Sequence, residues 1–360
     1  MLSFHAITPP EYMPQALCIE PEPDAYGVQV MDMKRGMAAI LVAGAFMVMA
    51  MFHTQIREAL LAAGERCVCV LIPSLYCYAV LAAVCTGSGL LMWMIRPLDR
   101  FTKRVLHADA VLLAVVVFSQ LGGYPVGAQL LHGLSEKGCI TRAQEQRMLC
   151  ACIGCGPGFL LGTVCRNVPG KMAAWILLSV ILPNLLLGIL LARGCRIREE
   201  HTVPEWNAQV FTRAVDSAAS GMLKICAMVL LFAGIMGIAA PLHLPPVVQT
   251  LLEISCITEL RDAGCSLPLA AGLLAFGGIC VHLQLAAICG GLPWLRFWGC
   301  RILAGAASYG ICLAGIRMMP EAVSAGCLLQ ETAVFSFGAV PGIALLAMSI
   351  LLLCRRERRI

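Results

Sequence analysis

Residues 122–129 read GGYPVGAQ and residues 277–284 read GGICVHLQ, so both octapeptides fit the pattern G-G-x-x-V-x-x-Q. The two copies start 155 residues apart, and each interrupts a stretch that is otherwise apolar enough to lie in lipid. Paired glycines weaken a helix, and irregular backbone at membrane depth persists only where protein covers it or where it lines a cavity. Paired interruptions at corresponding places in two halves of a membrane protein are typical of a transporter's binding site.

The composition places the chain among membrane proteins. Hydrophobic residues make up 59% of the sequence and charged residues 13%, with a mean hydropathy of +0.83, whereas soluble domains carry roughly 25% charged residues. Because a spanning helix needs about 20 apolar residues, we predict about eight spans and a multi-pass integral membrane protein surrounded by the lipid bilayer. The windows without Asp, Glu, Lys or Arg are 36–56, 67–95, 110–135, 148–165, 172–192, 225–252, 266–295, 302–316 and 332–354.

The 20 cysteines are scattered singly through the apolar windows. Cys152 and Cys155 form a C-x-x-C pair, but a zinc or redox site would need a second such pair or a histidine pair, and the sequence has neither. Free buried cysteine behaves as a small hydrophobic residue. We therefore expect reduced thiols, no metal site and no cofactor, and leave open an ion coupled to transport.

The placement of charge predicts the topology. Basic residues cluster at 34–35, 193–198 and 355–359, whereas segment 253–262 carries three acidic residues and one arginine. By the positive-inside rule, the three basic clusters and both termini lie in the cytoplasm, and the protein is expected in the cell membrane. The basic tail has no interleaved aromatic residues, so we expect no nucleic-acid binding.

The chain divides into four parts. Residues 1–33 hold five acidic residues and five prolines without an apolar period, which predicts a disordered extension, with translation from a later methionine as the alternative. Residues 34–192 form a first transmembrane half, 193–221 a cytoplasmic linker with an interfacial helix, and 222–360 a second half with the basic tail. Segment 54–66 is predicted to be a similar interfacial helix. The fold expected is an all-α polytopic transmembrane helix bundle with two related, inverted halves and two broken or re-entrant elements.

Five segments resemble, in the same order, segments of the YlbJ-type sporulation integral membrane proteins. They are PSLYCYAVL (73–81), SQLGGYPVGAQLLHGLSEKGCIT (119–141), GCGPGFLLGTV (154–164), LEISCITEL (252–260) and FGGICVHLQ (276–284). The resemblance extends over residues 36–354. It points to the nucleoside-recognition or Gate-domain group, which is related in plan to concentrative nucleoside transporters.

The resemblance implies a transporter that acts in endospore formation and passes dipicolinic acid from the mother cell to the forespore, which would place it in the outer forespore membrane. The chain departs from the family pattern at two points. Ile153–Cys155 stands where the family usually has an asparagine before its glycine-proline, and Ser255-Cys256 stands where it often has threonine-asparagine. Amides that could bind a carboxylate or a pyridine nitrogen are missing there, so a nucleoside-type solute is the first alternative.

Two glutamines, Gln129 and Gln284, end the two octapeptides. In lipid a glutamine finds a partner or lines a cavity, because an unsatisfied amide costs several kcal/mol; the alternative to ligand contact is a hydrogen bond between helices. The paired glycines could present backbone N–H groups to an anion or permit close helix packing. The predicted substrate-binding residues are Gly122, Gly123, Tyr124, Pro125, Gly127, Gln129, Gly156, Pro157, Gly277, Gly278, His282 and Gln284.

Three candidate residues carry other functional groups. Tyr124 could stack on an aromatic ligand or anchor its helix. His282 is ionisable within an apolar window, which marks a functional candidate, although a lone histidine is also a common packing residue. Glu253 is the carboxylate to which the family pattern points, and it is the candidate for ion or proton coupling.

These residues predict a carrier for a small anionic organic solute, with dipicolinic acid as the specific candidate. The second alternative is a membrane scaffold needed for assembly of the spore cortex or envelope, and self-association stays open. An enzyme would need apposed acids, metal ligands or a Ser/His dyad. Ionisable residues are sparse in the apolar windows, so we expect no catalysis.

Overall fold

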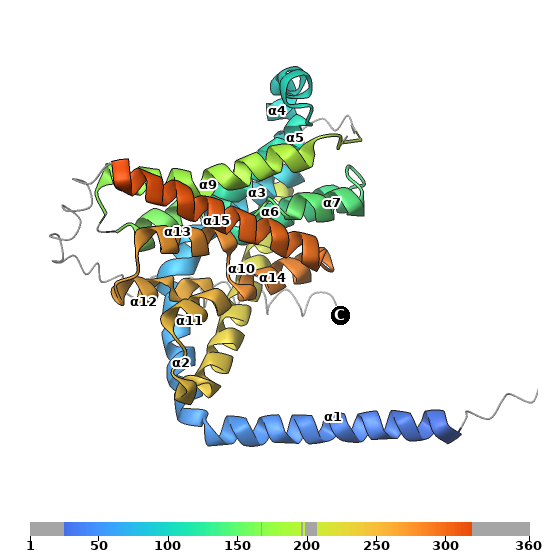
Figure 1. Cartoon of the computed structure of the whole chain (residues 1–360). Helices are drawn as coiled ribbons and strands as arrows, with labels where there is room; N and C mark the ends of the chain where they lie inside the picture. The colour runs from blue at the N-terminus through green and yellow to red at the C-terminus, as the bar shows by residue number, and fades with distance from the viewer. Residues whose placement is uncertain (1–24, 167, 196, 199–206, 319–360) are drawn as a thin grey trace, which may run out of the picture. The chain divides into compact units, whose positions relative to one another are not determined.

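The computed structural model describes residues 25–318, apart from 167, 196 and 199–206. These residues are almost entirely helical, and no β-strand occurs among them (Figure 1). The described part of the chain is therefore all-α, as the sequence predicts.

The chain forms two compact units, Met1–His53 and Thr54–Ile360. In the first unit, helix α1 (Ala25–Met51) begins before residue 34, inside the segment that the sequence predicts to be disordered. Its apolar part, Arg35–Met51, exposes large apolar side chains on all sides. An all-round apolar surface is typical of a helix that contacts lipid.

Five helical stretches of the described residues are long and apolar enough to cross a membrane, which indicates a multi-pass membrane protein. The number is smaller than the eight spans predicted, and the predicted span 332–354 and the basic residues at 355–359 lie outside the described residues. The five stretches are His53–Gly87, made of α2 (His53–Arg66), a π-helical turn η1 (Cys67–Leu71) and α3 (Ile72–Gly87); α9 (Gly170–Ala192); α10 (Ala208–Ile238); Leu267–Cys289, made of α13 (Leu267–Phe276) and α14 (Ile279–Cys289); and α15 (Trp294–Met318).

The two helices predicted to be interfacial are not separate elements but parts of longer helices. Segment 54–66 continues through the π-helical turn into α3, and the predicted helix after residue 206 is the first part of the 31-residue α10. Neither junction contains a residue that must end a helix. Pro73 lacks an N–H and would clash within regular α-helix, and the wider π-helical turn directly before it absorbs this defect.

Window 148–165 is not a span either. It contains the end of α7 (Arg142–Leu149), a stretch without regular structure, the single turn α8 (Pro157–Phe159) and a π-helical turn η3 (Leu160–Val164). Helix α7 has already ended at Leu149 when the chain reaches the glycines at 154 and 156 and the proline after them. Gly156 has a φ of +73° that only glycine adopts readily. The residues from Cys150 to Ile153 are fully buried, so this irregular segment runs through the interior.

Both copies of the octapeptide contain a helix break. Helix α5 (Ala110–Gly122) is separated from α6 (Tyr124–Glu136) by Gly123, which has a φ of +91°. Helix α13 is separated from α14 by Gly277, with a φ of +75°, and by Gly278. None of these four helices exceeds 13 residues, and each is too short to cross a bilayer alone.

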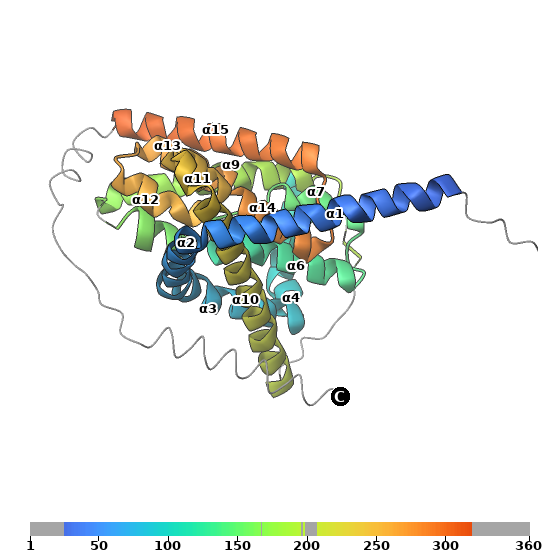
Figure 2. The same cartoon turned by 90° about the horizontal axis from the view of Figure 1, so that it is seen from below.

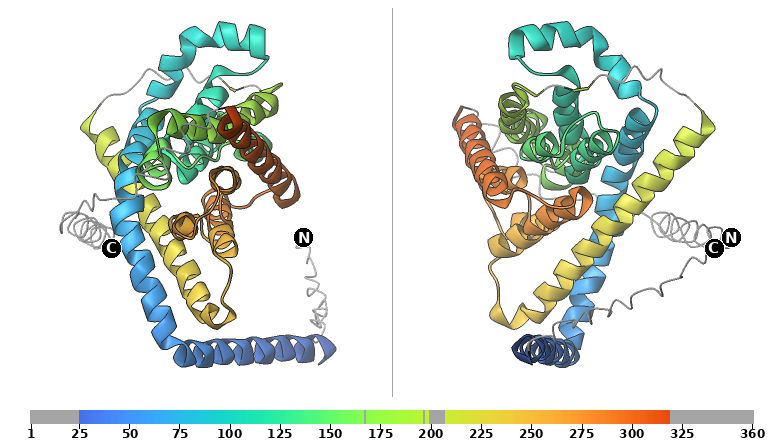
Figure 3. Two further views of the ribbon diagram at one scale, coloured as in Figure 1. Left: turned by 60° about the vertical axis from the view of Figure 1, so that its left-hand side comes forward. Right: turned by 90° about the vertical axis from the view of Figure 1, so that its right-hand side faces the viewer.

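The long helices pack in two groups. Helix α15 lies along α9 and α13 in both Figure 1 and Figure 2. Helices α2–α3 and α10 lie side by side and run in opposite directions (Figure 3). Helix α6 contacts α14, which brings the two octapeptides together. The remaining elements are α4 (Leu90–Phe101), η2 (Thr102–Leu106), η4 (Ala240–Leu242), α11 (Pro246–Leu252), η5 (Ile254–Cys256) and α12 (Ile257–Asp262).

Candidate functional site

Three irregular segments meet where the helices break. The hydroxyl of Tyr124, the first residue of α6, donates to the carbonyl of Leu274 near the end of α13, at 3.0 Å. A Cβ on Gly277 would lie 3.6 Å from Cε1 of Tyr124 and 3.7 Å from the Ile153 side chain. A Cβ on Gly156 would lie 3.3 Å from the backbone nitrogen of Gly123. The two octapeptides and segment 150–156 therefore form one contact region.

Glu253 also lies in this region. A Cβ on Gly278 would come within 2.8 Å of the Ile254 nitrogen, so glycine is needed for the close approach of α14 and η5. The Glu253 carboxylate, which is 1% exposed, accepts hydrogen bonds from the backbone N–H of Ser255 at 3.0 Å and from the Ser255 hydroxyl. Burial raises the pKa of the Glu253 carboxyl, while the Ser255 hydrogen bonds oppose the shift.

Several predicted site residues serve close packing. A Cβ on Gly127 would lie 2.6 Å from the carbonyl oxygen of Cys152, and one on Gly122 would lie 2.8 Å from the Val126 side chain. Pro157 begins the single turn α8. These glycines and this proline thus set how closely the irregular segments approach each other.

His282 lies among aromatic side chains. Its ring makes edge-to-face contacts with Phe276 and Phe297, at centroid distances of 5.0 and 4.9 Å, and Nε2 lies 3.1 Å from the carbonyl oxygen of Phe276. His282 lines none of the three cavities considered below. This position suits packing at the end of α13 better than contact with a solute.

A cavity of about 900 Å³ lies between α3, α6, α10 and α14, and both Gln129 and Gln284 line it. The Gln129 amide fits against Gly221 of α10, where a Cβ would lie 2.4 Å from its nitrogen. Gln284 donates to Sγ of Cys280 at 3.3 Å. The two glutamines of the repeated pattern therefore face the same space from two different helices.

The ionisable lining of this cavity is mainly basic. Lys137, Arg213 and Lys224 line it together with His132, whereas Glu136 is its acidic residue. Lys137 donates to the carbonyl of Thr86 at 2.8 Å, and both residues line the cavity. The summed charge favours an anion over a cation.

Two further cavities lie along the same helices. A space of about 20 Å³ shares Ile225 and Gln284 with it and is also lined by Tyr124, Pro125 and Glu253. A third cavity, of about 440 Å³, is lined by Arg66 and Glu259, which form an ion pair between α2 and α12.

The three cavities follow one another along two antiparallel helices. On α10 they are lined in turn by 210–228, 225–229 and 233–237; on the α2–α3 stretch they are lined by 82–87, 71–75 and 55–66. The α2–α3 and α10 helices cross beside each other in Figure 3. Helix α10 has 31 residues and, at 1.5 Å per residue, is about 46 Å long. The row therefore extends over a distance comparable to a bilayer with its headgroups.

Arg301 is the site residue that the sequence analysis missed. It lies within α15, is fully buried, and donates to Asn184 Oδ1 at 2.9 Å, to the carbonyl of Ala275 at 3.3 Å and to the carbonyl of Cys150. Among the described residues no carboxylate forms an ion pair with it, and its Nε has no hydrogen-bond partner. The negative ends of the α7 and α13 dipoles face its charge instead.

Arg301 joins the irregular segments to the long helices. Asn184 of α9 also donates to Gln120 Oε1 at 3.4 Å, and Gln120 donates to the carbonyl of Ile153 at 3.1 Å. A signal existed in the sequence, since two arginines, Arg296 and Arg301, separate windows 266–295 and 302–316. Windows defined by the absence of charge end at such residues. The structure shows one continuous helix there.

No family model, no curated protein and no solved structure matches this chain. The resemblance to sporulation membrane proteins therefore stays an expectation from five sequence segments, and the geometry above must support any function on its own.

Proposed function

We propose that the protein is a membrane carrier for a small anionic organic solute, which moves along the row of cavities between α2–α3 and α10. One observation carries this proposal: the glutamines of both octapeptides, Gln129 and Gln284, line the same cavity among an excess of basic side chains. A repeated motif that contributes the same residue type to one site from two helices is expected of a carrier built from two related halves.

The chemistry of the 900 Å³ cavity favours a carboxylate. Its volume lies within the range of small-molecule sites, roughly 300–1,000 Å³. Arg213 and Lys224 are exposed at its edge and would attract an anion, with a dependence on ionic strength. The amides of Gln129 and Gln284 would donate hydrogen bonds that are stronger when the acceptor is charged.

The small middle cavity suggests how access would alternate. At about 20 Å³ it is too small for an organic solute, so passage requires movement at Tyr124, Pro125 and Glu253. The glycine breaks between α5 and α6 and between α13 and α14 are the hinges we propose for this movement, and they are the broken elements of the two inverted halves. Protonation and deprotonation of Glu253 would couple this movement, and with it the passage of the solute, to a proton.

Dipicolinate is the specific solute we propose, acting in endospore formation at the outer forespore membrane. The resemblance supports this choice, and so does the cavity, because an aromatic dicarboxylate needs at least two cationic partners and an apolar wall. We also propose that both termini lie in the cytoplasm, which the placement of the basic residues supports through the positive-inside rule.

The test is uptake of dipicolinate by the purified protein in proteoliposomes, compared with uridine and a non-aromatic dicarboxylate. We expect dipicolinate flux, abolished by Gln129→Ala combined with Gln284→Ala. Gln209→Ala is the matched control, since Gln209 is exposed on α10 and outside the cavity lining. Uridine flux without dipicolinate flux would favour the nucleoside alternative, and no flux of any solute would favour the scaffold.

A further inference from the structure

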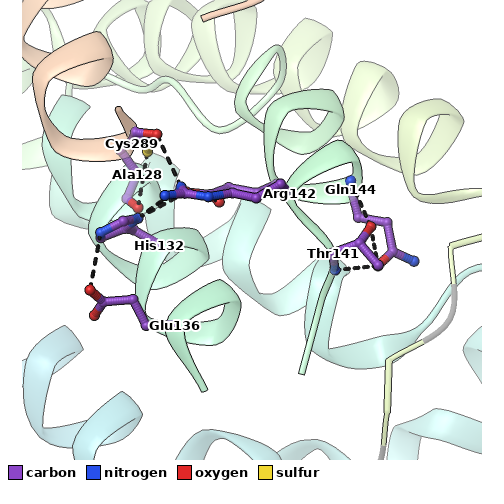
Figure 4. Close-up of polar contacts among 8 residues, drawn as sticks. Ala128, His132, Glu136, Thr141, Arg142, Gln144 and Cys289 are labelled. Atoms are coloured by element: carbon purple, nitrogen blue, oxygen red, sulfur yellow. Dashed lines mark hydrogen bonds and ion pairs between the residues drawn. The ribbon is translucent and has the colours of Figure 1, made fainter. Parts of the chain in front are cut away.

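A second polar cluster lies beside the 900 Å³ cavity, where α6, α7 and α14 meet (Figure 4). A ring nitrogen of His132, a carboxylate oxygen of Glu145 and Sγ of Cys289 all lie within 4.8 Å of one another. Glu145 and Cys289 are buried, whereas His132 lines the cavity. A capping box between Thr141 and Gln144 fixes the start of α7 (Figure 4). Glu145 follows at the next position, and its side chain is fully buried.

This cluster is built around a cation. Nη1 of Arg142 donates to Oε2 of Glu145 at 2.9 Å and to the carbonyl oxygen of Cys289 at 3.1 Å, and it lies 3.5 Å from Nδ1 of His132. Nδ1 of His132 in turn lies 3.1 Å from Oε1 of Glu145. When Nδ1 is unprotonated these two atoms are both acceptors, and only a positive charge or a proton can hold them together.

We propose that His132, Glu145 and Cys289 bind Zn²⁺ in competition with the Arg142 side chain. An imidazole nitrogen, a carboxylate oxygen and a thiolate sulfur are ligands that zinc accepts together. On binding, the Cys289 thiol loses its proton to solvent, and the ligands then carry two negative charges against the two positive charges of the ion. Arg142 has a 61% exposed side chain and can withdraw into solvent.

Two details of the geometry fit a zinc site. Nε2 of His132 lies 3.4 Å from Oε1 of Glu136, and metal-binding histidines commonly donate their other N–H to a carboxylate. Tetrahedral zinc separates its ligand atoms by about 3.4–3.6 Å, from the usual bond lengths, so side-chain movements on the order of 1 Å suffice. The fourth coordination position would face the cavity, because His132 lines it.

A bound ion would fasten α6 to α14, the helices that carry Gln129 and Gln284. Zinc would therefore hold the two halves of the cavity wall together and restrict its opening. Only this consequence rests on the proposed transport function; binding of the ion does not.

The test is zinc binding by the full-length protein in detergent, measured by metal analysis after gel filtration and by titration with a fluorescent zinc chelator as competitor. Cobalt(II) is the spectroscopic probe, because a cysteine ligand gives a thiolate-to-metal charge-transfer band. We expect one tight equivalent of zinc and the band in the wild type. Cys289→Ser should remove the band and weaken zinc binding at least tenfold, roughly the effect expected when a site loses part of its coordination. Cys265→Ser, at a partly exposed cysteine outside the cluster, should change neither.

Substitution of Arg142, whose guanidinium competes with the ion, distinguishes a metal site from an ion-pair network. Arg142→Gln should tighten zinc binding, by about tenfold, since the ion no longer displaces a guanidinium. Glu136→Gln should weaken it, by about 10- to 100-fold. If Cys289→Ser does not fold, as judged by gel filtration and circular dichroism, His132→Gln replaces it, because His132 is only partly buried. Equal zinc binding in the wild type, Cys289→Ser and His132→Gln would overturn the proposal, as would weaker binding in Arg142→Gln.

Discussion

Replacement of Gly277 by alanine tests how strongly the second helix break depends on glycine. Gly277 has a φ of +75° and a ψ of +146°, a backbone conformation that residues with a Cβ rarely adopt. A Cβ there would meet no atom closer than 3.6 Å, so the substitution adds no overlap and its cost is backbone strain alone. Such strain costs about 1–3 kcal/mol, and we expect the free energy of unfolding to fall by this amount.

The matched control is Gly310→Ala in the middle of α15. No atom lies within 4 Å of a Cβ placed on Gly310, and alanine is favoured over glycine within a helix by about 0.5–1 kcal/mol, so this variant should be at least as stable as the wild type. Both variants would be unfolded by SDS titration in mixed micelles and followed by circular dichroism. If Gly277→Ala unfolds with the same free energy as Gly310→Ala, the backbone at the break is not held in the glycine conformation and the reasoning is refuted.

Three further predictions concern buried charge and topology. Arg301→Met should lower the free energy of unfolding in the same assay by about 1–3 kcal/mol, because it leaves buried carbonyls without a donor while removing a costly charge; unchanged stability would contradict this role. The pKa of Glu253 is raised above its ordinary 4.5, so its contribution to stability is full below 4.5 and is lost as pH rises through the raised pKa. In the wild type the free energy of unfolding should therefore decline above pH 4.5, and Glu253→Gln should remove this decline. Identical pH profiles of the wild type and the variant would contradict a raised pKa of Glu253. Tag fusions should place 193–198 and the C-terminus on the same face, and opposite faces would refute the topology.

The helix breaks could be predicted from the sequence because their cause is local. A left-handed backbone position favours glycine whatever surrounds it, and Gly123 and Gly277 have positive φ values within a repeated pattern. The joint position of Gln129 and Gln284 in one cavity is consistent with the repeat, although the pattern alone does not say which helices enclose that cavity.

Features that depend on distant partners could not be predicted. The charge of Arg301 is tolerated because acceptors arrive from Cys150, Asn184 and Ala275, which no window of sequence contains together. The long α2–α3 stretch depends on a π-helical turn that compensates Pro73. The proposed zinc ligands come from three helices with no regular spacing, which is why counting C-x-x-C pairs led us to expect no metal.

The buried guanidinium of Arg301 has a consequence for biosynthesis. An arginine within a span opposes insertion into the bilayer by up to about 2.5–3.5 kcal/mol, the cost at the centre, and α15 has the lowest mean hydropathy of the five long stretches, 1.4. Its acceptors on α9 and α13 are synthesised earlier, since both helices precede α15 in the chain. Helix α15 would then leave the translocon against a partly assembled protein instead of entering lipid alone, which makes its insertion a late and folding-dependent step.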